Sequence, residues 1–398
     1  MAVDLTSEAC PKGFQCSGIR AGLKEEPKKD LGLIFTENPA IVGGVFTQNR
    51  FPAAPVQYCK SLVPANNFRA LIVNSGNANA ATGQSGIDAN YQMASRLAKE
   101  IDVDPAQVLT SSTGIIGRPF PIQEIENAIP PLVEKLDSDI KSFSEAILTT
   151  DIKAKTAVVK FQIGAETYTV AGTTKGSGMI HPNMATMLAY VLTDAPLPFS
   201  SIQEIAAETA AASFNVVSID GDTSTNDSFF IICSNPVESI DAGVLTQVKT
   251  AISEVAVSLA KQIAADGEGA EHLLEVTISE APSVEIADSV LQAVLTSNLV
   301  KTAIHGQDPN WGRLLMAVGN GLSSFQVPNN LPISIEIQST PVFVKGEPVS
   351  VDEKHLTDLL AKFEVFVHIN LHHGQHAATG WGCDLSHGYV SINADYST

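Results

Sequence analysis

Short apolar runs rich in β-branched residues alternate with longer segments of helical periodicity along the whole chain, and this alternation constrains the fold most. The clearest helical segment runs from Val244 to Ile263, where apolar residues recur on one face. Further helices are predicted at 91–101, at 122–134 with an interruption at Pro130–Pro131, and at 202–213, 284–295 and 352–363. Strands are predicted at 70–73, 228–233, 274–278, 333–337 and 365–370. Interleaved strands and helices favour a layered α/β protein over a helical bundle or a β-sandwich.

Composition and charge exclude several classes of protein. The chain has 398 residues, 44% of them hydrophobic, which is enough to bury a core and argues against intrinsic disorder. It has no apolar stretch long enough to span a bilayer, and its start lacks the features of a secretory signal, so we expect a cytoplasmic protein. A net charge of -19 without any basic run disfavours nucleic-acid binding and leaves small molecules as the expected partners.

The standard motifs for nucleotide binding, catalytic zinc and serine hydrolases are absent from the sequence. The five cysteines are scattered, with no C-x-x-C pair, which argues against a disulfide framework or a cysteine-rich zinc site. Histidines cluster between His368 and His376, but no carboxylate or cysteine accompanies them at a fixed spacing, so we interpret the segment as a turn between strands. The sequence therefore predicts neither a metal nor a cofactor.

Two polar segments allow more than one interpretation. Residues 220–227, DGDTSTND, begin like a calcium loop but lack the glycine and glutamate that such a loop needs, which leaves a polar turn or the lining of a site. Residues 175–190, KGSGMIHPNMATMLAY, follow a hairpin predicted at 153–175 and place Thr186 at the start of a strand. Threonine is common in strands, so this position alone does not identify a nucleophile.

Eight motifs, in order along the chain, resemble those of the ornithine acetyltransferase family, also called bifunctional glutamate N-acetyltransferase or ArgJ. GMIHPNMATMLAYVLTDA at 178–195 is similar to the self-cleavage region of that family. The others are NSGNANAATG (74–83), SSTGIIGRP (111–119), TTD (149–151), DGDTSTND (220–227), DGEGA (266–270), GQDPNWGR (306–313) and INADYST (392–398). The resemblance covers essentially the whole chain. It implies a layered αββα fold of the ArgJ and DmpA aminopeptidase type, with a smaller C-terminal part that completes the site.

The resemblance also implies a reaction. The chain is expected to cut itself between Ala185 and Thr186 into pieces 1–185 and 186–398, so that Thr186 carries a hydroxyl and a free α-amino group. Such an amine has a pKa of about 7.7 to 8.0 and can accept the hydroxyl proton, which makes the threonine an N-terminal nucleophile. An acetyl ester on Thr186 would then carry the acetyl group from N-acetylornithine to glutamate, in the arginine-biosynthetic pathway.

Further residues carry over from the family motifs. The Thr113 hydroxyl and the Gly114 backbone N–H are the expected oxyanion donors, although from the local sequence alone a turn is the better interpretation. The expected substrate contacts are Thr149, Lys175, Thr186, Glu268, Asn393 and Thr398. Lysine can meet a carboxylate and glutamate an ammonium, and the remaining side chains can hydrogen-bond acetyl or carboxylate oxygens.

Three functions remain open from the sequence. The first is the acetyltransferase, assembled as α2β2 from cleaved chains, with acetyl-CoA as a further acetyl donor that the sequence neither requires nor excludes. The second is an N-terminal-nucleophile aminopeptidase or amidohydrolase that uses the same threonine with water as acceptor. The third is a ligand-binding protein that is never processed.

Overall fold

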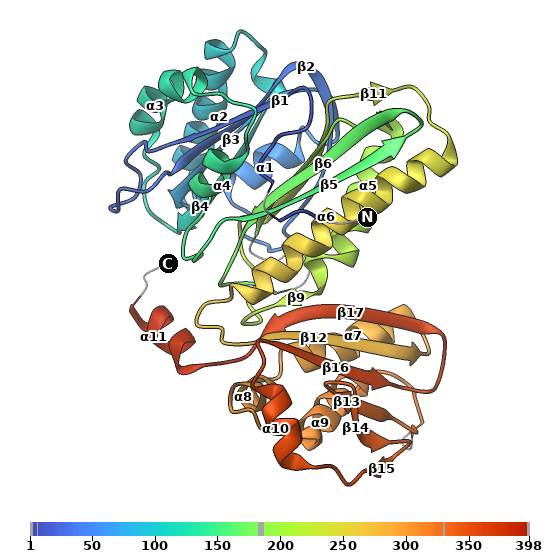
Figure 1. Cartoon of the computed structure of the whole chain (residues 1–398). Helices are drawn as coiled ribbons and strands as arrows, with labels where there is room; N and C mark the ends of the chain where they lie inside the picture. Colours follow the sequence, from blue (N-terminus) through green and yellow to red (C-terminus); the bar gives the residue numbers. More distant parts are fainter. Residues whose placement is uncertain (1–2, 6, 182–186, 329–330, 396–398) are drawn as a thin grey trace.

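The computed structural model describes residues 3–5, 7–181, 187–328 and 331–395. The expected cleavage positions Ala185 and Thr186 and the C-terminal Thr398 therefore lie outside the described residues. Figure 1 shows an N-terminal part built around one large sheet and a C-terminal part built around a second sheet. None of the helices in the described ranges combines the length and the apolar character needed to cross a membrane.

The first sheet contains β1 Phe14–Ile19, β2 Leu31–Phe46, β3 Ala65–Asn77, β4 Val108–Ile115, β5 Lys155–Ile163, β6 Glu166–Lys175, β7 Leu188–Thr193 and β10 Ser228–Cys233. The strand order is β4-β3-β2-β10-β7-β6-β5, with β1 beside β2. The long strand β2 changes partners along its length. On one edge it pairs with β3 from Leu31 to Val42, and on the other it pairs first with β1, over Leu31–Thr36, and then with β10, over Ile41–Phe46. The register of β2 against β3 shifts between Phe35 and Ala40 and again between Ala40 and Val42, so the pairing is irregular in the middle of β2.

The half of this sheet that contains β3 faces the half that contains β7 and β10 across a buried aromatic core. Tyr190 of β7 stacks on Phe230 of β10, with ring centroids 6.0 Å apart, and meets the edge of Phe143 at 5.2 Å. The same core includes Leu71 and Val73 of β3 from the opposite half. The helices beside this core are α1 Ala54–Lys60 and α4 Lys141–Ala146.

Helices cover both outer faces of the folded sheet (Figure 1). The helices are α2 Gly83–Glu100 and α3 Ile122–Glu134 against β2, β3 and β4, and α5 Phe199–Ala212 and α6 Ala242–Ala265 on the other side. The order of layers is thus helix, sheet, sheet, helix, which confirms the αββα fold expected from the sequence. Asp241 caps the N-terminus of helix α6, because its carboxylate accepts the backbone N–H groups of Gly243 and Val244.

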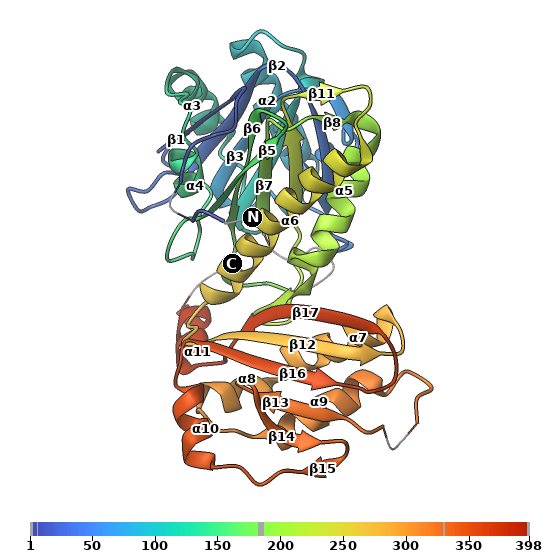
Figure 2. The ribbon, with the colours of Figure 1, turned by 45° about the vertical axis from the view of Figure 1, so that its right-hand side comes forward.

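The C-terminal part is built on a second sheet in the order β15-β14-β13-β16-β12-β17-β9. Its strands are β9 Val217–Ser218, β12 Leu273–Ala281, β13 Ser334–Ile337, β14 Thr340–Val344, β15 Glu347–Pro348, β16 Glu364–Asn370 and β17 His376–Cys383. Its helices are α7 Val284–Leu295, α8 Asn298–His305, α9 Trp311–Leu322, α10 Glu353–Leu360 and α11 His387–Asp395, and a short pair, β8 Leu197–Pro198 and β11 Pro236–Val237, lies apart. Figure 2 shows α11 at the boundary between the two parts.

Two helix predictions need correction. Helix α2 begins at Gly83 rather than at residue 91, because its polar, glycine-containing first half carries no apolar periodicity. Helix α3 runs without a break through Pro130 and Pro131, close to its end at Glu134. Each proline removes one N–H donor and crowds the carbonyl four residues before it, but so near the end of the helix the pair disturbs only the last turns.

Candidate active site

A cavity of about 410 Å³ opens where the ends of β4 and β6 meet the loop after α6 and the final helix α11. Every expected site residue that the structure describes lines this cavity: Thr113, Gly114, Thr149, Lys175, Glu268 and Asn393. They come from distant parts of the sequence and from both the N-terminal and the C-terminal parts of the fold. The fold therefore gathers into one place side chains that the sequence connects only through the family resemblance.

Lys175 and Thr113 meet on one wall of the cavity. Lys175 is the last residue of β6 and is only 4% exposed, and its Nζ donates a hydrogen bond of 3.1 Å to Thr113 Oγ1. Because the ammonium group can only donate, the threonine oxygen accepts, and the hydroxyl hydrogen is left to donate to another group. This arrangement suits a hydroxyl that stabilises developing negative charge.

Gly114 follows Thr113 at a position that only glycine fits. Its φ is +127°, and a Cβ there would lie 2.4 Å from the carbonyl carbon of Gly76 on the adjacent strand β3. A side chain would therefore force the two strands apart. The absence of a side chain lets the backbone of β4 reach the cavity wall.

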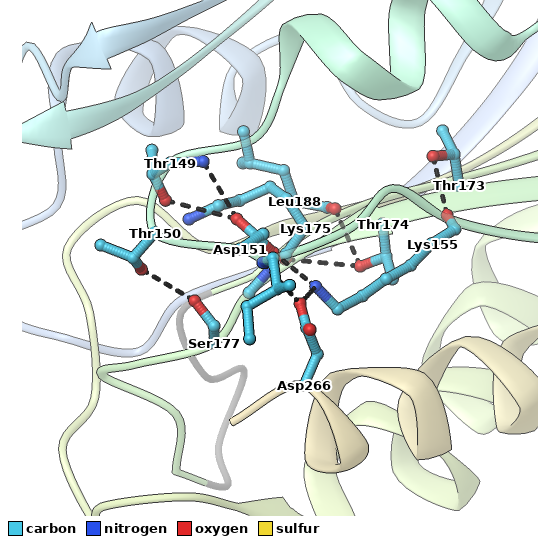
Figure 3. A network of polar contacts seen from close by, with 12 residues as sticks. Thr149, Thr150, Asp151, Lys155, Thr173, Thr174, Lys175, Ser177, Leu188 and Asp266 are labelled. Atoms are coloured by element: carbon cyan, nitrogen blue, oxygen red, sulfur yellow. Dashed lines mark hydrogen bonds and ion pairs between the residues drawn. The ribbon is translucent and has the colours of Figure 1, made fainter. Parts of the chain in front are cut away.

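Three buried charged groups support the wall that carries Lys175 (Figure 3). Lys155 Nζ lies 2.6 Å from Asp151 Oδ1 and 2.5 Å from Asp266 Oδ2, and the three side chains are at most 3% exposed. Asp151 also accepts backbone N–H groups from Thr149 at 3.0 Å and from Gly176 at 2.7 Å. The carboxylate thus ties the segment that contains Thr149 to the chain immediately after Lys175.

Burial and neighbouring charges shift the pKa values in this region in opposite directions. Burial alone would raise the pKa of Asp151, but the positive charges of Lys155 and Lys175 outweigh it and hold that pKa well below its usual range. Burial lowers the pKa of Lys175, whereas the negative charge of Asp151 raises it. Lys175 is therefore a buried cation whose charge depends on the anions that surround it.

The opposite wall is formed by Glu268 and the last helix. Asn393 of α11 donates from Nδ2 to Glu268 Oε2 at 2.8 Å, and Tyr389 donates its hydroxyl to Asp220 Oδ2 at 3.3 Å. Gly178 leaves room for the Glu268 carboxylate, since a Cβ at that position would lie 2.4 Å from Oε2. The C-terminal part of the chain therefore contributes side chains to the cavity.

The segment 220–227 lines the site rather than forming a plain polar turn. Asn226 donates from Nδ2 to the carbonyl oxygens of Ala78 and Ser112, at 2.6 and 2.8 Å, and so holds β4 just before Thr113. Asp227 Oδ1 accepts the backbone N–H of Met187, at 3.0 Å. Met187 is the residue that follows Thr186 in the sequence.

Comparison with known proteins identifies the family. A model of the ArgJ family matches residues 15–398. The chain belongs to the ArgJ family. Curated relatives include the arginine biosynthesis bifunctional protein ArgJ of Dehalococcoides mccartyi, which is 40% identical over 394 residues, or 98% of this chain and 96% of the relative. The protein of the same name from Bacillus cereus is 42% identical over 403 residues, or 100% of this chain and 98% of the relative.

Solved structures give matches of more limited extent. The ArgJ crystal structure from Bacillus halodurans is 40% identical, with a TM-score of 0.42, and covers 46% of this chain and 98% of that chain. The ornithine acetyltransferase of Mycobacterium tuberculosis, crystallised with ornithine, is 29% identical, with a TM-score of 0.42 and coverage of 46% and 98%.

Several polar residues of this ArgJ-family site were not predicted from the sequence. Asp151 lies inside the TTD motif, so the motif marked its position but not its role. Asp266 likewise opens the DGEGA motif without its role being apparent, and Lys155 gave no signal, because lysine and aspartate are rarely buried unless they are paired, and pairing is visible only in the fold. Tyr389 lies within α11 and outside the eight motifs, so the sequence does not mark it.

The histidine cluster lies elsewhere in this ArgJ-family fold. His368 is on β16 and bonds Ser279 Oγ at 2.8 Å, and His372 lies in the turn before β17 and contacts Glu280 Oε2 at 3.1 Å. This confirms the interpretation of the segment as a turn between strands. Within the described ranges, no group of three or more His, Cys, Asp or Glu side chains is placed to hold a metal ion.

Proposed function

We propose that this protein transfers the acetyl group of N-acetylornithine to glutamate, releasing ornithine and N-acetylglutamate for arginine biosynthesis. The observation that supports this most strongly is the convergence of Thr113, Gly114, Thr149, Lys175, Glu268 and Asn393 on one cavity. Membership of the ArgJ family supports the same activity. The proposed site of action is the cytoplasm.

Thr186 is the proposed nucleophile, generated by cleavage of the bond between Ala185 and Thr186. Its Oγ attacks the acetyl carbonyl of N-acetylornithine while the hydroxyl proton passes to its own α-amino group. Collapse of the tetrahedral intermediate breaks the amide bond, and the leaving amine of ornithine takes that proton. The α-amine of glutamate then attacks the acetyl ester, and Thr186 Oγ recovers a proton as N-acetylglutamate leaves.

Thr113 and Gly114 are the proposed donors to the oxyanion of both tetrahedral intermediates. A donor of this kind typically contributes about 3 to 4 kcal/mol of transition-state stabilisation. The hydrogen bond from Lys175 to Thr113 Oγ1 supports this role, because it leaves the hydroxyl hydrogen free to donate.

The charges of the cavity suit substrates that are amino acids. Lys175 is proposed to bind a substrate carboxylate, and Glu268 the ammonium group of ornithine or glutamate. Thr149, Asn393 and Thr398 are proposed to hydrogen-bond acetyl or carboxylate oxygens. Asn393 already donates to Glu268 Oε2, so the two side chains would recognise substrate together.

The proposed pieces, 1–185 and 186–398, would share one sheet. Strand β6 of the first piece pairs with β7 of the second, from Lys175 opposite Leu188 to Val170 opposite Thr193. Strand β2 of the first piece pairs with β10 of the second along six residue pairs, so both ladders join the two pieces. We propose that cleaved chains stay associated in this way and assemble further as α2β2.

The decisive assay follows both products of N-acetylornithine and glutamate turnover. Acetyl transfer predicts that ornithine and N-acetylglutamate form in equal amounts and that ornithine release depends on glutamate. Ornithine release with free acetate, independent of glutamate, would instead identify a hydrolase. The same assay with acetyl-CoA in place of N-acetylornithine tests acetyl-CoA as a second donor.

A further inference from the structure

Asp151 has no part in the proposed chemistry. It nevertheless connects the segment that contains Thr149 to the segment that contains Lys175 (Figure 3). Its Oδ2 accepts the backbone N–H of Thr149 at 3.0 Å, and its Oδ1 accepts the backbone N–H of Gly176 at 2.7 Å. Thr149 lines the cavity, and Gly176 directly follows Lys175, which also lines it. One carboxylate therefore sets the separation of two segments that form the substrate cavity.

The carboxylate is itself held in place from behind. Lys155 Nζ lies 2.6 Å from Asp151 Oδ1 and is anchored on its other side by Asp266 Oδ2 at 2.5 Å. Asp266 closes the C-terminal end of α6, and its carboxylate also accepts the backbone N–H of Ile152 at 3.2 Å. Because these side chains are buried, no water competes for the contacts, and rotation of Asp151 would leave charged groups unpaired.

We propose that Asp151 is a positioning residue for acetyl transfer, which holds Thr149 and the Lys175–Gly176 peptide at their working separation across the cavity. The inference rests on the proposed function, because it assigns Asp151 to the same site. Lys155 and Asp266 act as its anchors.

The charge of Asp151 provides a readout that packing alone would not change. The acidic groups that face Lys175 are Asp151, Glu268 and Asp227, of which burial favours the neutral form of Asp227; the basic groups that face it are Lys155 and Lys24. Burial lowers the pKa of Lys175 and Asp151 raises it, so removal of the Asp151 charge lowers that pKa further. If charged Lys175 binds the substrate carboxylate, the loss of activity at alkaline pH then begins at a lower pH.

The test compares Asp151→Asn with wild type across pH, for both N-acetylornithine and glutamate. We expect kcat/KM to fall on the order of 10²-fold, since displacements of about 1 Å at a site cost that much. We also expect the alkaline limb of the pH profile of kcat/KM to move to lower pH. Asp194→Asn is the matched control: Asp194 is also buried and accepts the N–H groups of Thr169 and Lys12, at the other end of β6. It should keep the wild-type rate and pH profile.

Two double variants decide the question if Asp151→Asn fails to fold. Asp151→Asn/Lys155→Met and Lys155→Met/Asp266→Asn each remove one cation and one anion from the same triad, but only the second keeps Asp151. Replacing a buried pair together often leaves stability unchanged. A larger loss of kcat/KM in the first supports the proposal, and equal losses overturn it.

The proposal is also overturned if Asp151→Asn folds and keeps wild-type kcat/KM, or if it loses activity with an unmoved alkaline limb, as a purely structural residue would. These outcomes presuppose a wild-type enzyme that transfers acetyl groups. A wild-type protein that releases ornithine without forming N-acetylglutamate would refute the proposed function instead.

Discussion

Lys175 Nζ lies 3.1 Å from Thr113 Oγ1, although β6 and β4 are separated by four other strands in the order of the first sheet. Neighbouring strands lie about 4.8 Å apart, so in a flat sheet these strands would be about 24 Å from each other. The contact exists because β2 changes partners along its length and folds the sheet over. The αββα architecture is therefore what brings the proposed oxyanion donor to the lysine.

Replacing Lys175 tests this contact directly. Lys175→Met keeps an unbranched side chain of similar length but removes both the donor to Thr113 and the charge, so kcat/KM should fall on the order of 10²-fold or more. Steady-state kinetics with N-acetylornithine and glutamate measure the effect. Lys160→Met, on the exposed face of β5, is the control and should behave as wild type. Comparable activity in the two variants would contradict the assigned role.

Gly114→Ala should impair both folding and catalysis. Positive φ at a non-glycine residue costs about 1 to 3 kcal/mol, and here the new Cβ would also meet the Gly76 backbone at 2.4 Å. Urea unfolding and kcat report the two effects. Gly164→Ala is the matched control, because Gly164 also has positive φ but nothing lies within 4 Å of the place that its new Cβ would occupy. If the two variants were equally stable and active, the close approach of β4 and β3 would be unimportant.

The two proposed pieces should remain together after cleavage. The β6–β7 and β2–β10 ladders and their buried core join residues before 185 to residues after 186. A denaturing gel is expected to show two bands, while size-exclusion chromatography without denaturant gives one peak that contains both. Elution of the pieces in separate peaks would count against the proposed assembly.

Replacement by asparagine should destabilise the protein much more at Asp151 than at Asp227, because the pKa values of these two buried aspartates are shifted in opposite directions. The lysine charges hold the pKa of Asp151 below its usual range, so its stabilising effect is present above the unfolded pKa of about 3.9 and is lost as the pH falls through the lower folded value. Burial raises the pKa of Asp227 well above its usual range, which favours the neutral acid that asparagine resembles.

At pH 7, Asp151→Asn should therefore cost about 3 to 5 kcal/mol of unfolding free energy, as for a broken buried ion pair. Asp227→Asn should cost about 1 kcal/mol or less, since its amide oxygen can still accept the Met187 N–H. Urea unfolding measures both. The reverse order would show that Asp227, not Asp151, is the charged group.

The sequence predicted the layered fold and the residues of the site better than it predicted the contacts between those residues. Apolar periodicity located α6 and α7 because both helices bury one continuous face. It missed the first half of α2, which has a polar sequence, and it could not show that β2 bends to serve both halves of the sheet. The family resemblance named Thr113 and Lys175, but only the fold reveals that one donates to the other.

Mass measurement of the intact protein after incubation with N-acetylornithine alone tests the central claim most directly. The account predicts two fragments, corresponding to residues 1–185 and 186–398, of which only the second, beginning with Thr186, gains the mass of one acetyl group and loses it when glutamate is added. A single uncleaved chain that still turns over normally, or an acetyl group on the first fragment, would contradict the assignment of Thr186 as the nucleophile.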